Sequence, residues 1–267
     1  MSFFQLFILA VVQGLTEFLP ISSSGHLILL PRVMGMPDQG QVIDVAVHVG
    51  TLLAVVIFFW SDVREGLLGI PRMLTGRIDT PGSRLAFLMA IATVPVIFFG
   101  LVLSLLGLDD AMRSIAVIGW AMIVFGVVLW WFDTKSPEVK EDRDWTVKDA
   151  VIMGLWQAIA LIPGTSRSGA TITGARALGY KREDGTRLAM IMSIPTIVAS
   201  GLLLGAEAAA DADWQALRDG AIAAGMAFVA AMLALTIMMR LLKSVSFTPY
   251  VIYRLILGVI LLWVAYT

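Results

Sequence analysis

Two polar stretches that could carry chemistry interrupt apolar segments of this sequence. The first, "EFLPISSSGHLILL", holds Glu17, three consecutive serines and His26, and the second, "PGTSRSGATIT", places Arg167 between two serines. A charge at the centre of a bilayer costs about 2.5–3.5 kcal/mol on insertion scales, so buried charges in such segments indicate function by default. A structural ion pair between Glu17 and Arg167 is the alternative. We favour a functional site, because both stretches carry additional hydrogen-bond donors.

The second stretch is suited to an anion with several oxygens. The Arg167 guanidinium presents planar donors that match phosphate, and the neighbouring hydroxyls add further donors. We expect a helix to begin in each stretch, with its free N–H groups and positive dipole end directed at the ligand. Close helix packing alone would explain single residues such as Ser24 or Gly169, but not Arg167. The candidate binding residues are Gln13, Ser22, Ser24, Gly25, Ser166, Ser168, Gly169 and Thr171.

The first stretch supplies a base and candidate nucleophiles. Glu17 can act as a general base or a metal ligand, and His26 can transfer protons near neutral pH, although a lone histidine can also serve only as a packing hydrogen-bonder. Any of serines 22–24 could be activated by an adjacent base. Asp44 and His48 stand four residues apart and either line the same cavity or bond to each other. The pattern predicts phosphoryl transfer or hydrolysis on a substrate with a lipid tail.

The composition indicates a protein whose solvent is lipid. Of 267 residues, 58% are hydrophobic and 15% are charged, against about 25% charged in soluble domains. The net charge of −1 excludes a polybasic nucleic-acid binder, and the absence of cysteine excludes disulfides and thiolate metal sites. We expect the first apolar segment to belong to the mature protein, because no charged region precedes it as in a signal peptide.

A helix needs about 20 apolar residues to cross a bilayer, and six apolar segments of the sequence meet that length. They are residues 42–60, 85–107, 115–132, 188–206, 220–239 and 251–266. The two interrupted regions, 3–34 and 150–179, could each form two full spans. We favour a re-entrant hairpin of two half-membrane helices for each, because the polar tips are unsuited to face lipid. Basic connections after the first, third and fifth spans and after the second hairpin are expected to be cytoplasmic, which puts both chain termini outside.

The two interrupted regions align with each other without gaps. Gln13 falls on Gln157, Ser22 on Ser166, and Gly25 on Gly169. Each half then has one hairpin and three spans, and an odd number of crossings inverts the second copy. The expected fold is an all-α polytopic membrane protein with six full transmembrane helices and two re-entrant hairpins in an inverted-topology repeat. Residues 1–267 form a single membrane domain, with repeats 1–132 and 150–267 joined by a cytoplasmic linker, 133–149.

Three motifs resemble those of one known family. "QGLTEFLPISSSGH" and "PGTSRSGATIT" look like the two signature motifs of the bacterial undecaprenyl-diphosphate phosphatases linked to bacitracin resistance, and "SFTPYVIYR" is similar to a third family stretch. The resemblance implies hydrolysis of the C55 polyprenyl diphosphate to the monophosphate and phosphate, which recycles the lipid carrier for peptidoglycan and other wall polymers. It also implies a divalent cation, Mg or Ca, and a location in the bacterial inner membrane.

The resemblance also implies roles for single residues. Glu17, Ser23, His26 and Arg167 match the family's catalytic positions, with Ser166 and Thr171 beside the phosphate-binding arginine. Gln13 stands where many members have glutamate. Because an amide is neither a base nor a strong metal ligand, Glu17 carries more of both tasks here. Either Ser23 attacks phosphorus, with Glu17 or His26 as base, or water attacks and Ser23 only binds.

Other functions are open to the same pattern. Inverted repeats with broken helices are also typical of secondary transporters, so a transporter or lipid flippase is the second interpretation. A purely structural membrane protein is a distant third. The expected partners are the polyprenyl diphosphate and the bilayer, with no nucleic acid, and a homodimer is left open.

Overall fold

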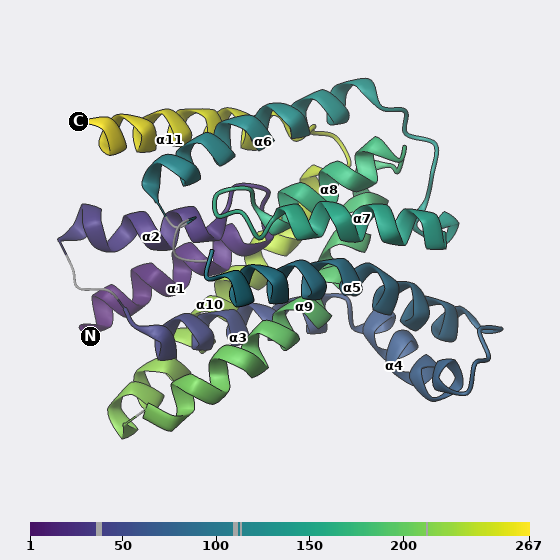
Figure 1. Ribbon diagram of the computed structural model, residues 1–267, viewed down its shortest axis with the longest axis horizontal. Coiled ribbons are helices and arrows are strands. Elements are labelled where there is room, and N and C mark those ends of the chain that lie inside the picture. The colour runs from purple at the N-terminus through teal and green to yellow at the C-terminus, as the bar shows by residue number, and fades with distance from the viewer. Residues whose placement is uncertain (36–38, 109–111, 113, 212) are drawn as a thin grey trace.

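The computed structural model describes residues 1–35, 39–108, 112, 114–211 and 213–267, and it is all helical (Figure 1). Parts of the two connections expected outside the membrane, 109–111, 113 and 212, lie beyond the described residues. The elements in chain order are α1 (Phe3–Phe18), α2 (Ser23–Met34), α3 (Gln41–Phe58), α4 (Trp60–Leu74), α5 (Pro81–Leu106), α6 (Ile115–Lys135), the 3₁₀-helix η1 (Asp142–Asp144), α7 (Val147–Ile159), α8 (Arg167–Ala177), α9 (Arg182–Asp211), α10 (Trp214–Leu241) and α11 (Thr248–Tyr266).

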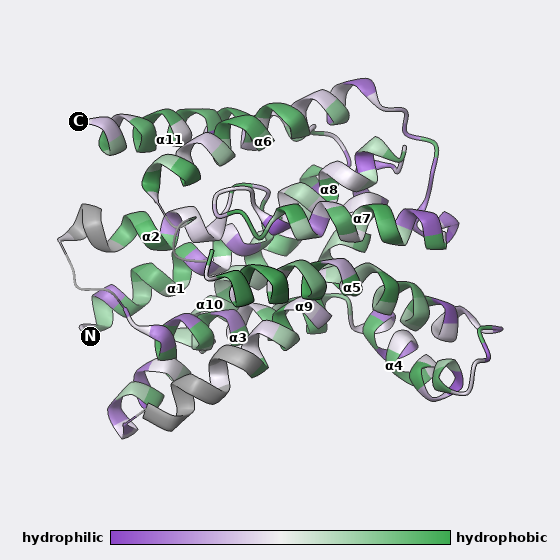
Figure 2. Ribbon diagram, viewed as in Figure 1, coloured by the Kyte–Doolittle hydropathy of each residue, from purple (hydrophilic) through white to green (hydrophobic). Residues whose placement is uncertain are grey.

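Six helices of the described chain are long and apolar enough to cross a membrane: α3, α5, α6, α9, α10 and α11. Each contains the middle of one segment expected to span, so the prediction of a multi-pass membrane protein is confirmed. Figure 2 shows hydrophobic residues along α5, α6 and α11, whereas much of the connection between α6 and α7 is hydrophilic. Large apolar side chains such as Leu105 and Trp263 are exposed on the outside, as expected where lipid replaces water.

One helix, α4, is absent from the sequence prediction, which placed only a basic connection there and extended the first span to Trp60. The first spanning helix, α3, ends at Phe58 because Phe59 leaves helical geometry (φ −104°, ψ 32°), and α4 begins at Trp60. α4 packs along α5, and Asp62 in its first turn pairs with Arg187 of α9 at 2.5 Å. A basic segment can therefore be helical where its other face packs on a neighbouring helix.

Both interrupted regions are broken helices, as expected. α1 and α2 are separated by a turn at residues 19–22, and α7 and α8 by a turn at residues 160–166. The free ends of α1 and α2 lie at the end of the molecule that carries both termini, and those of α7 and α8 at the opposite end (Figure 1). The two turns meet inside, where the Ser168 hydroxyl donates to the Leu19 carbonyl at 3.0 Å.

Helix packing follows a regular scheme. α1 packs on α10 and α7 on α5, while α3 packs on α9 and α10, and α6 on α11. α6 and α11 approach so closely that a Cβ at Gly258 would lie 2.9 Å from the Gly119 carbonyl oxygen. Small residues are the usual means of such contact between membrane helices.

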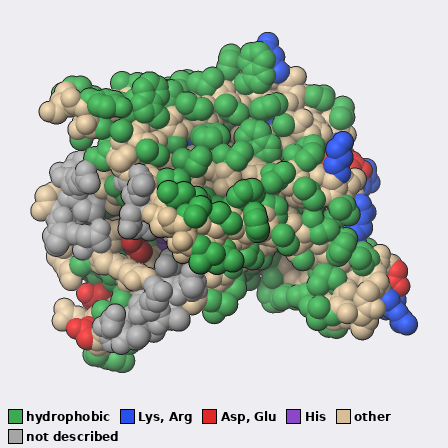
Figure 3. Space-filling model, viewed as in Figure 1, with side chains coloured by type: hydrophobic (Ala, Val, Ile, Leu, Met, Phe, Trp, Pro, Cys, Tyr) green, Lys and Arg blue, Asp and Glu red, His purple; other side chains and the backbone are tan. Residues whose placement is uncertain are grey.

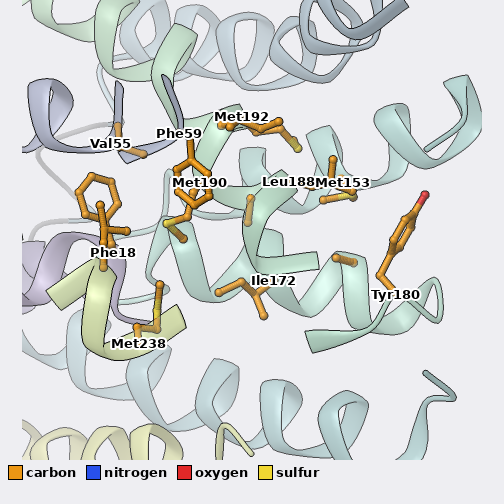
Figure 4. Close-up of a cluster of buried hydrophobic side chains, with 14 of the residues drawn as sticks. Phe18, Val55, Phe59, Met153, Ile172, Tyr180, Leu188, Met190, Met192 and Met238 are labelled. Carbon is orange, nitrogen blue, oxygen red and sulfur yellow. The ribbon is translucent and has the colours of Figure 1, made fainter. Parts of the chain in front are cut away.

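The largest hydrophobic cluster of the described residues joins α1 and α8 to the long helices α9 and α10. It includes Phe18 of α1, Ile172 of α8, Met190 of α9 and Met238 of α10 (Figure 4). Methionine side chains are flexible and fill irregular gaps between helices. The cluster therefore fixes how the ends of α1 and α8 lie relative to the spans.

A buried carboxylate, Asp133, joins four helices at the end of the molecule away from the termini. It lies in the last turn of α6 and accepts hydrogen bonds from Arg182 of α9 at 2.7 Å and from the Phe247 N–H next to α11 at 3.1 Å. It also lies 3.3 Å from Arg176 of α8. The aspartate that begins the expected linker is thus part of the packed structure.

We expect Asp133→Asn to lower the free energy of unfolding by about 3 kcal/mol, because Arg176 and Arg182 lose their buried carboxylate and keep only the exposed carboxylate of Glu138. Thermal unfolding of the purified protein in detergent measures this as a lower Tm. Asp79→Asn is the matched control, since it breaks only the exposed pair of Asp79 with Arg72, and its Tm should equal that of the wild type. Equal Tm values for both variants would contradict the role given to Asp133.

Candidate active site

Glu17 is the centre of the candidate site. It lies in the last turn of α1 and is buried. Its Oε2 accepts hydrogen bonds from Gln13 Nε2 at 2.8 Å and from the Ser23 hydroxyl at 2.7 Å, and its Oε1 accepts from the Arg167 guanidinium, with which it forms an ion pair. The structure therefore brings together a carboxylate, a hydroxyl and a guanidinium that come from three helices.

The local sequence explains why these groups meet. Gln13 and Glu17 are four residues apart and so lie on one face of α1. Pro20 follows the end of α1, and the chain turns so that α2 begins at Ser23. Ser22, just before α2, has a φ of +72°, a left-handed conformation that is uncommon outside glycine. Such geometry is often retained at functional sites, where the surrounding contacts hold it in place.

The second turn repeats this geometry. Ser166 has a φ of +71° and precedes α8, whose first residue is Arg167. Its hydroxyl accepts the Gly169 N–H at 3.1 Å, as a helix N-cap does, and lies 3.1 Å from the Ser168 hydroxyl. In the first turn the Ser22 and Ser24 hydroxyls lie 3.2 Å apart in the same way. Two helix N-termini, with free N–H groups, therefore begin at the meeting point of the turns.

His26 does not lie where a base for Ser23 would be expected. Its Nδ1 lies 2.7 Å from the Ser22 carbonyl oxygen and its Nε2 lies 2.6 Å from the Tyr253 hydroxyl. Since a carbonyl only accepts, Nδ1 carries the proton in the neutral ring and Nε2 accepts from the tyrosine. Within the part of the chain that the structure describes, His26 has no hydrogen bond to Ser23 or Glu17. It supports the first turn and joins it to α11.

His48, for which the sequence left two possibilities open, lies beside Glu17. Its Nε2 is 3.8 Å from Glu17 Oε2, and its side chain is 37% exposed. Its Nδ1 bonds to the Asp44 carbonyl oxygen at 2.7 Å, so the lone pair of the neutral ring is on Nε2. The contact with Asp44 is thus through the main chain, and His48 lines the candidate site from α3.

The remaining predicted residues mainly hold the turns. The Thr171 hydroxyl donates to the Arg167 carbonyl at 2.9 Å within α8, and Gly25 faces Ile118 of α6. Gln157, the counterpart of Gln13, is buried and its amide makes no hydrogen bond within the described chain. In the alignment of the two interrupted regions, the second region thus keeps the amide but has Leu161 at the position of Glu17.

Sequence reasoning missed one residue that contacts both turns, Arg254 of α11. It is 0% exposed, and all the hydrogen bonds of its guanidinium to the described residues go to carbonyl oxygens. The acceptors are those of Thr165 at 2.8 Å, Gly164 at 3.2 Å, Met122 at 3.2 Å, Pro20 at 3.4 Å and Ala121 at 3.5 Å. The available signal was its charge within an apolar span, at the end of "SFTPYVIYR", to which the same rule applies as to Glu17 and Arg167.

The candidate site can bind an oxyanion and transfer a proton. The described residues contain no cluster of three or more histidine, aspartate or glutamate side chains that could hold a metal alone. Glu17 with His48 nearby is the strongest partial set. Gln13 Oε1 adds a buried oxygen without a hydrogen-bond partner.

The chain is similar along its whole length to several known proteins. The family model described as "Bacitracin resistance protein BacA" matches residues 6–260. A protein named undecaprenyl-diphosphatase from Ruegeria pomeroyi is 66% identical over 267 residues, covering all of both chains, and one from Jannaschia sp. (strain CCS1) is 67% identical over 266 residues with the same coverage. A third with that name, from Maricaulis maris, is 45% identical over 98% of each chain. By its motifs, its length and these matches, the chain belongs to the bacitracin resistance protein BacA family.

Proposed function

We propose that this chain hydrolyses undecaprenyl diphosphate to undecaprenyl monophosphate and inorganic phosphate. The product is the lipid carrier for peptidoglycan and other wall polymers, and its recycling confers resistance to bacitracin. The observation that carries the proposal is the contact of Glu17 with Ser23 and Arg167 at two helix N-termini inside an apolar helical body. A base, a hydroxyl and a phosphate-binding cation are the groups that hydrolysis of a diphosphate needs.

We also propose that the two broken helices are re-entrant hairpins of an inverted repeat. Support comes from the turns, since the aligned residues Ser22 and Ser166 share the same positive φ. Packing adds support, because α1 on α10 has its counterpart in α7 on α5, while α3 pairs with its own counterpart α9, and α6 with α11. A pseudo-twofold axis in the membrane plane would produce this pattern.

The proposed location is the bacterial inner membrane, with both termini external. Figure 3 shows lysine and arginine side chains gathered at the end of the molecule opposite the chain termini, as a cytoplasmic face would have. The polyprenyl tail would lie between or along the apolar spans, with the diphosphate between the turns. A homodimer is compatible with this arrangement but is not required, because one chain supplies both turns.

Two routes fit the geometry. In the first, Glu17 takes the proton of the Ser23 hydroxyl, Ser23 Oγ bonds to the terminal phosphorus, and the bond to the undecaprenyl phosphate oxygen breaks. Water then cleaves the phosphoserine to release phosphate and restore Ser23. In the second, Glu17 takes a proton from water, whose oxygen bonds to the terminal phosphorus while the bond to the undecaprenyl phosphate oxygen breaks, and Ser23 only binds. In both, Arg167 leaves Glu17 for the phosphoryl oxygens, where it stabilises the developing charge.

A divalent cation, Mg or Ca, fits the oxygen and nitrogen atoms at the site. Glu17 is the proposed ligand, and Gln13 Oε1 is a buried oxygen that lacks any other partner. His48 Nε2 is a third donor beside the carboxylate, although hard cations prefer oxygen. When bound, the cation would neutralise part of the diphosphate charge.

We expect Arg167→Ala to abolish orthophosphate release, because charge stabilisation is lost, and Glu17→Gln to be nearly inactive, because the base is lost. In each variant the rate of release should fall by about 10²-fold or more. The assay is phosphate release from polyprenyl diphosphate by purified protein in detergent. Detergent offers no second compartment, so activity there also argues against a transporter. Asp79→Asn is the control with unchanged turnover. Near-normal turnover of Arg167→Ala would remove that arginine from the mechanism.

Ser23→Ala should lower turnover far more than Ser24→Ala, because among these two serines Ser23 is the one bonded to Glu17. Acid quenching followed by mass spectrometry separates the two routes, since only serine attack leaves a phosphate on residue 23. Equal turnover in the two variants would show that the Ser23–Glu17 contact has no part in the reaction.

Removal of divalent cations with a chelator should stop phosphate release, and Mg or Ca should restore it. Gln13→Leu should weaken binding of the cation, because it removes the buried amide oxygen. Binding of Mn²⁺ to the purified protein, followed by its paramagnetic signal, gives a readout that is independent of turnover. Unchanged Mn²⁺ affinity in Gln13→Leu would exclude the amide as a ligand.

A further inference from the structure

We propose that Arg254 is a positioning residue of the phosphate site, which joins the two turns through their carbonyl groups and supplies a positive charge that no carboxylate of the described chain neutralises. This inference rests on the proposed function, because the charge is assigned to the binding of a diphosphate headgroup.

The contacts of Arg254 span both halves of the chain. Its guanidinium donates to the Pro20 carbonyl in the first turn and to the Gly164 and Thr165 carbonyls in the second. Its Nε and Nη2 also donate to carbonyls of α6, at Met122 and Ala121. A planar guanidinium with donors in several directions can hold such a set, whereas an ammonium group cannot match it.

These contacts bear on the reacting residues through the main chain. In a trans peptide the carbonyl and the following N–H point in opposite directions, so holding the Thr165 carbonyl orients the Ser166 peptide. Ser166 has the unfavourable φ of +71° and is followed directly by Arg167. On the other side, the Pro20 carbonyl lies two residues before Ser22, which has the matching φ and precedes Ser23. Arg254 therefore stabilises the backbone on which Arg167 and Ser23 are placed.

Gly169 gives independent support for a close fit. A Cβ on this residue would lie 2.9 Å from Nη1 of Arg254 and 3.2 Å from the Ser166 hydroxyl oxygen. A side chain here would displace the guanidinium or the N-cap. The glycine of the "SRSG" motif is thus explained by the space that Arg254 needs.

Arg254 differs from Arg167 and Arg176 in that its charge has no carboxylate partner among the described residues. Arg176 has Asp133 and Arg167 has Glu17 as ion-pair partners. Among the described residues, Arg254 donates to carbonyl oxygens and forms no ion pair with a carboxylate. Burial of an unpaired charge is costly, and carbonyl dipoles offset only part of that cost. Because Glu17 and Arg167 cancel each other, Arg254 leaves the meeting point of the turns net positive, ready for an anion.

The test compares Arg254→Gln, Arg254→Lys and the matched control Arg176→Gln. Arg176 is equally buried, lies at the other end of α8 and also donates to main-chain carbonyls, so its loss reports on burial and stability alone. For each protein in detergent, kcat for phosphate release and the affinity for inorganic pyrophosphate are measured. Pyrophosphate binding is followed both as competitive inhibition and as the rise in Tm that it causes.

We expect Arg254→Gln to weaken pyrophosphate binding by about tenfold or more and to lower kcat, because charge and geometry are both lost. Arg254→Lys should keep the affinity within about threefold but lower kcat by about tenfold, since it keeps the charge without the carbonyl contacts. Arg176→Gln should lower Tm and leave the pyrophosphate affinity unchanged.

Two results would overturn the inference. One is wild-type affinity and kcat in Arg254→Lys, together with either wild-type values or failure to fold in Arg254→Gln. The other is a loss of pyrophosphate affinity in Arg176→Gln as large as in Arg254→Gln. If the wild type releases no phosphate, the proposed function fails, but the Tm shift with pyrophosphate still tests the role of Arg254.

Discussion

The ion pair between Glu17 and Arg167 is the contact on which the rest of the site depends. The two residues are 150 positions apart in the chain and belong to different broken helices. Neither charge would be tolerated alone in an apolar interior, where removal of one partner typically costs about 3–5 kcal/mol. The pair holds the two turns together, and a phosphate that binds Arg167 has to displace the carboxylate. Under the proposed function, the structural ion pair and the phosphate-binding site are therefore two states of one contact.

The turns can hold these charges because short helices begin there. Each turn ends in a serine with positive φ, Ser22 or Ser166, and the next residue starts a helix whose first N–H groups have no carbonyl acceptor within that helix. Irregular backbone at membrane depth is tolerated only where protein or a cavity satisfies its polar groups. Here hydroxyls, the Arg254 guanidinium and neighbouring carbonyls do so, which explains why the polar stretches are serine-rich and lie inside apolar segments.

Much of the fold could be predicted from local sequence. The six spans follow from apolar length, and the two breaks follow from proline, glycine and serine within apolar runs. α4 was missed because basic residues marked its segment as a connection, and its packing on α5 is a tertiary property. A pairing of Glu17 with Arg167 could already be considered from the sequence, because two charges in apolar segments need a partner. The direction of His26 toward Tyr253 and the reach of Arg254 were not expected, and the place of His48 was left open, because each depends on a contact between residues distant in the chain.

Gln13 affects the balance of buried positive and negative charge at the site. Its amide donates to Glu17, so it stabilises the ionised carboxylate, which a second carboxylate at this position would repel. With glutamate there, the charges of two carboxylates would cancel those of Arg167 and Arg254. With glutamine, the buried cationic charge exceeds the anionic charge before any ligand binds. The family resemblance alone suggests that this departure weakens the site, since a base is lost. The geometry points the other way for binding: the chain keeps one base, already in contact with Ser23, and gains a net attraction for a diphosphate, whose charge would otherwise be brought into oil without compensation.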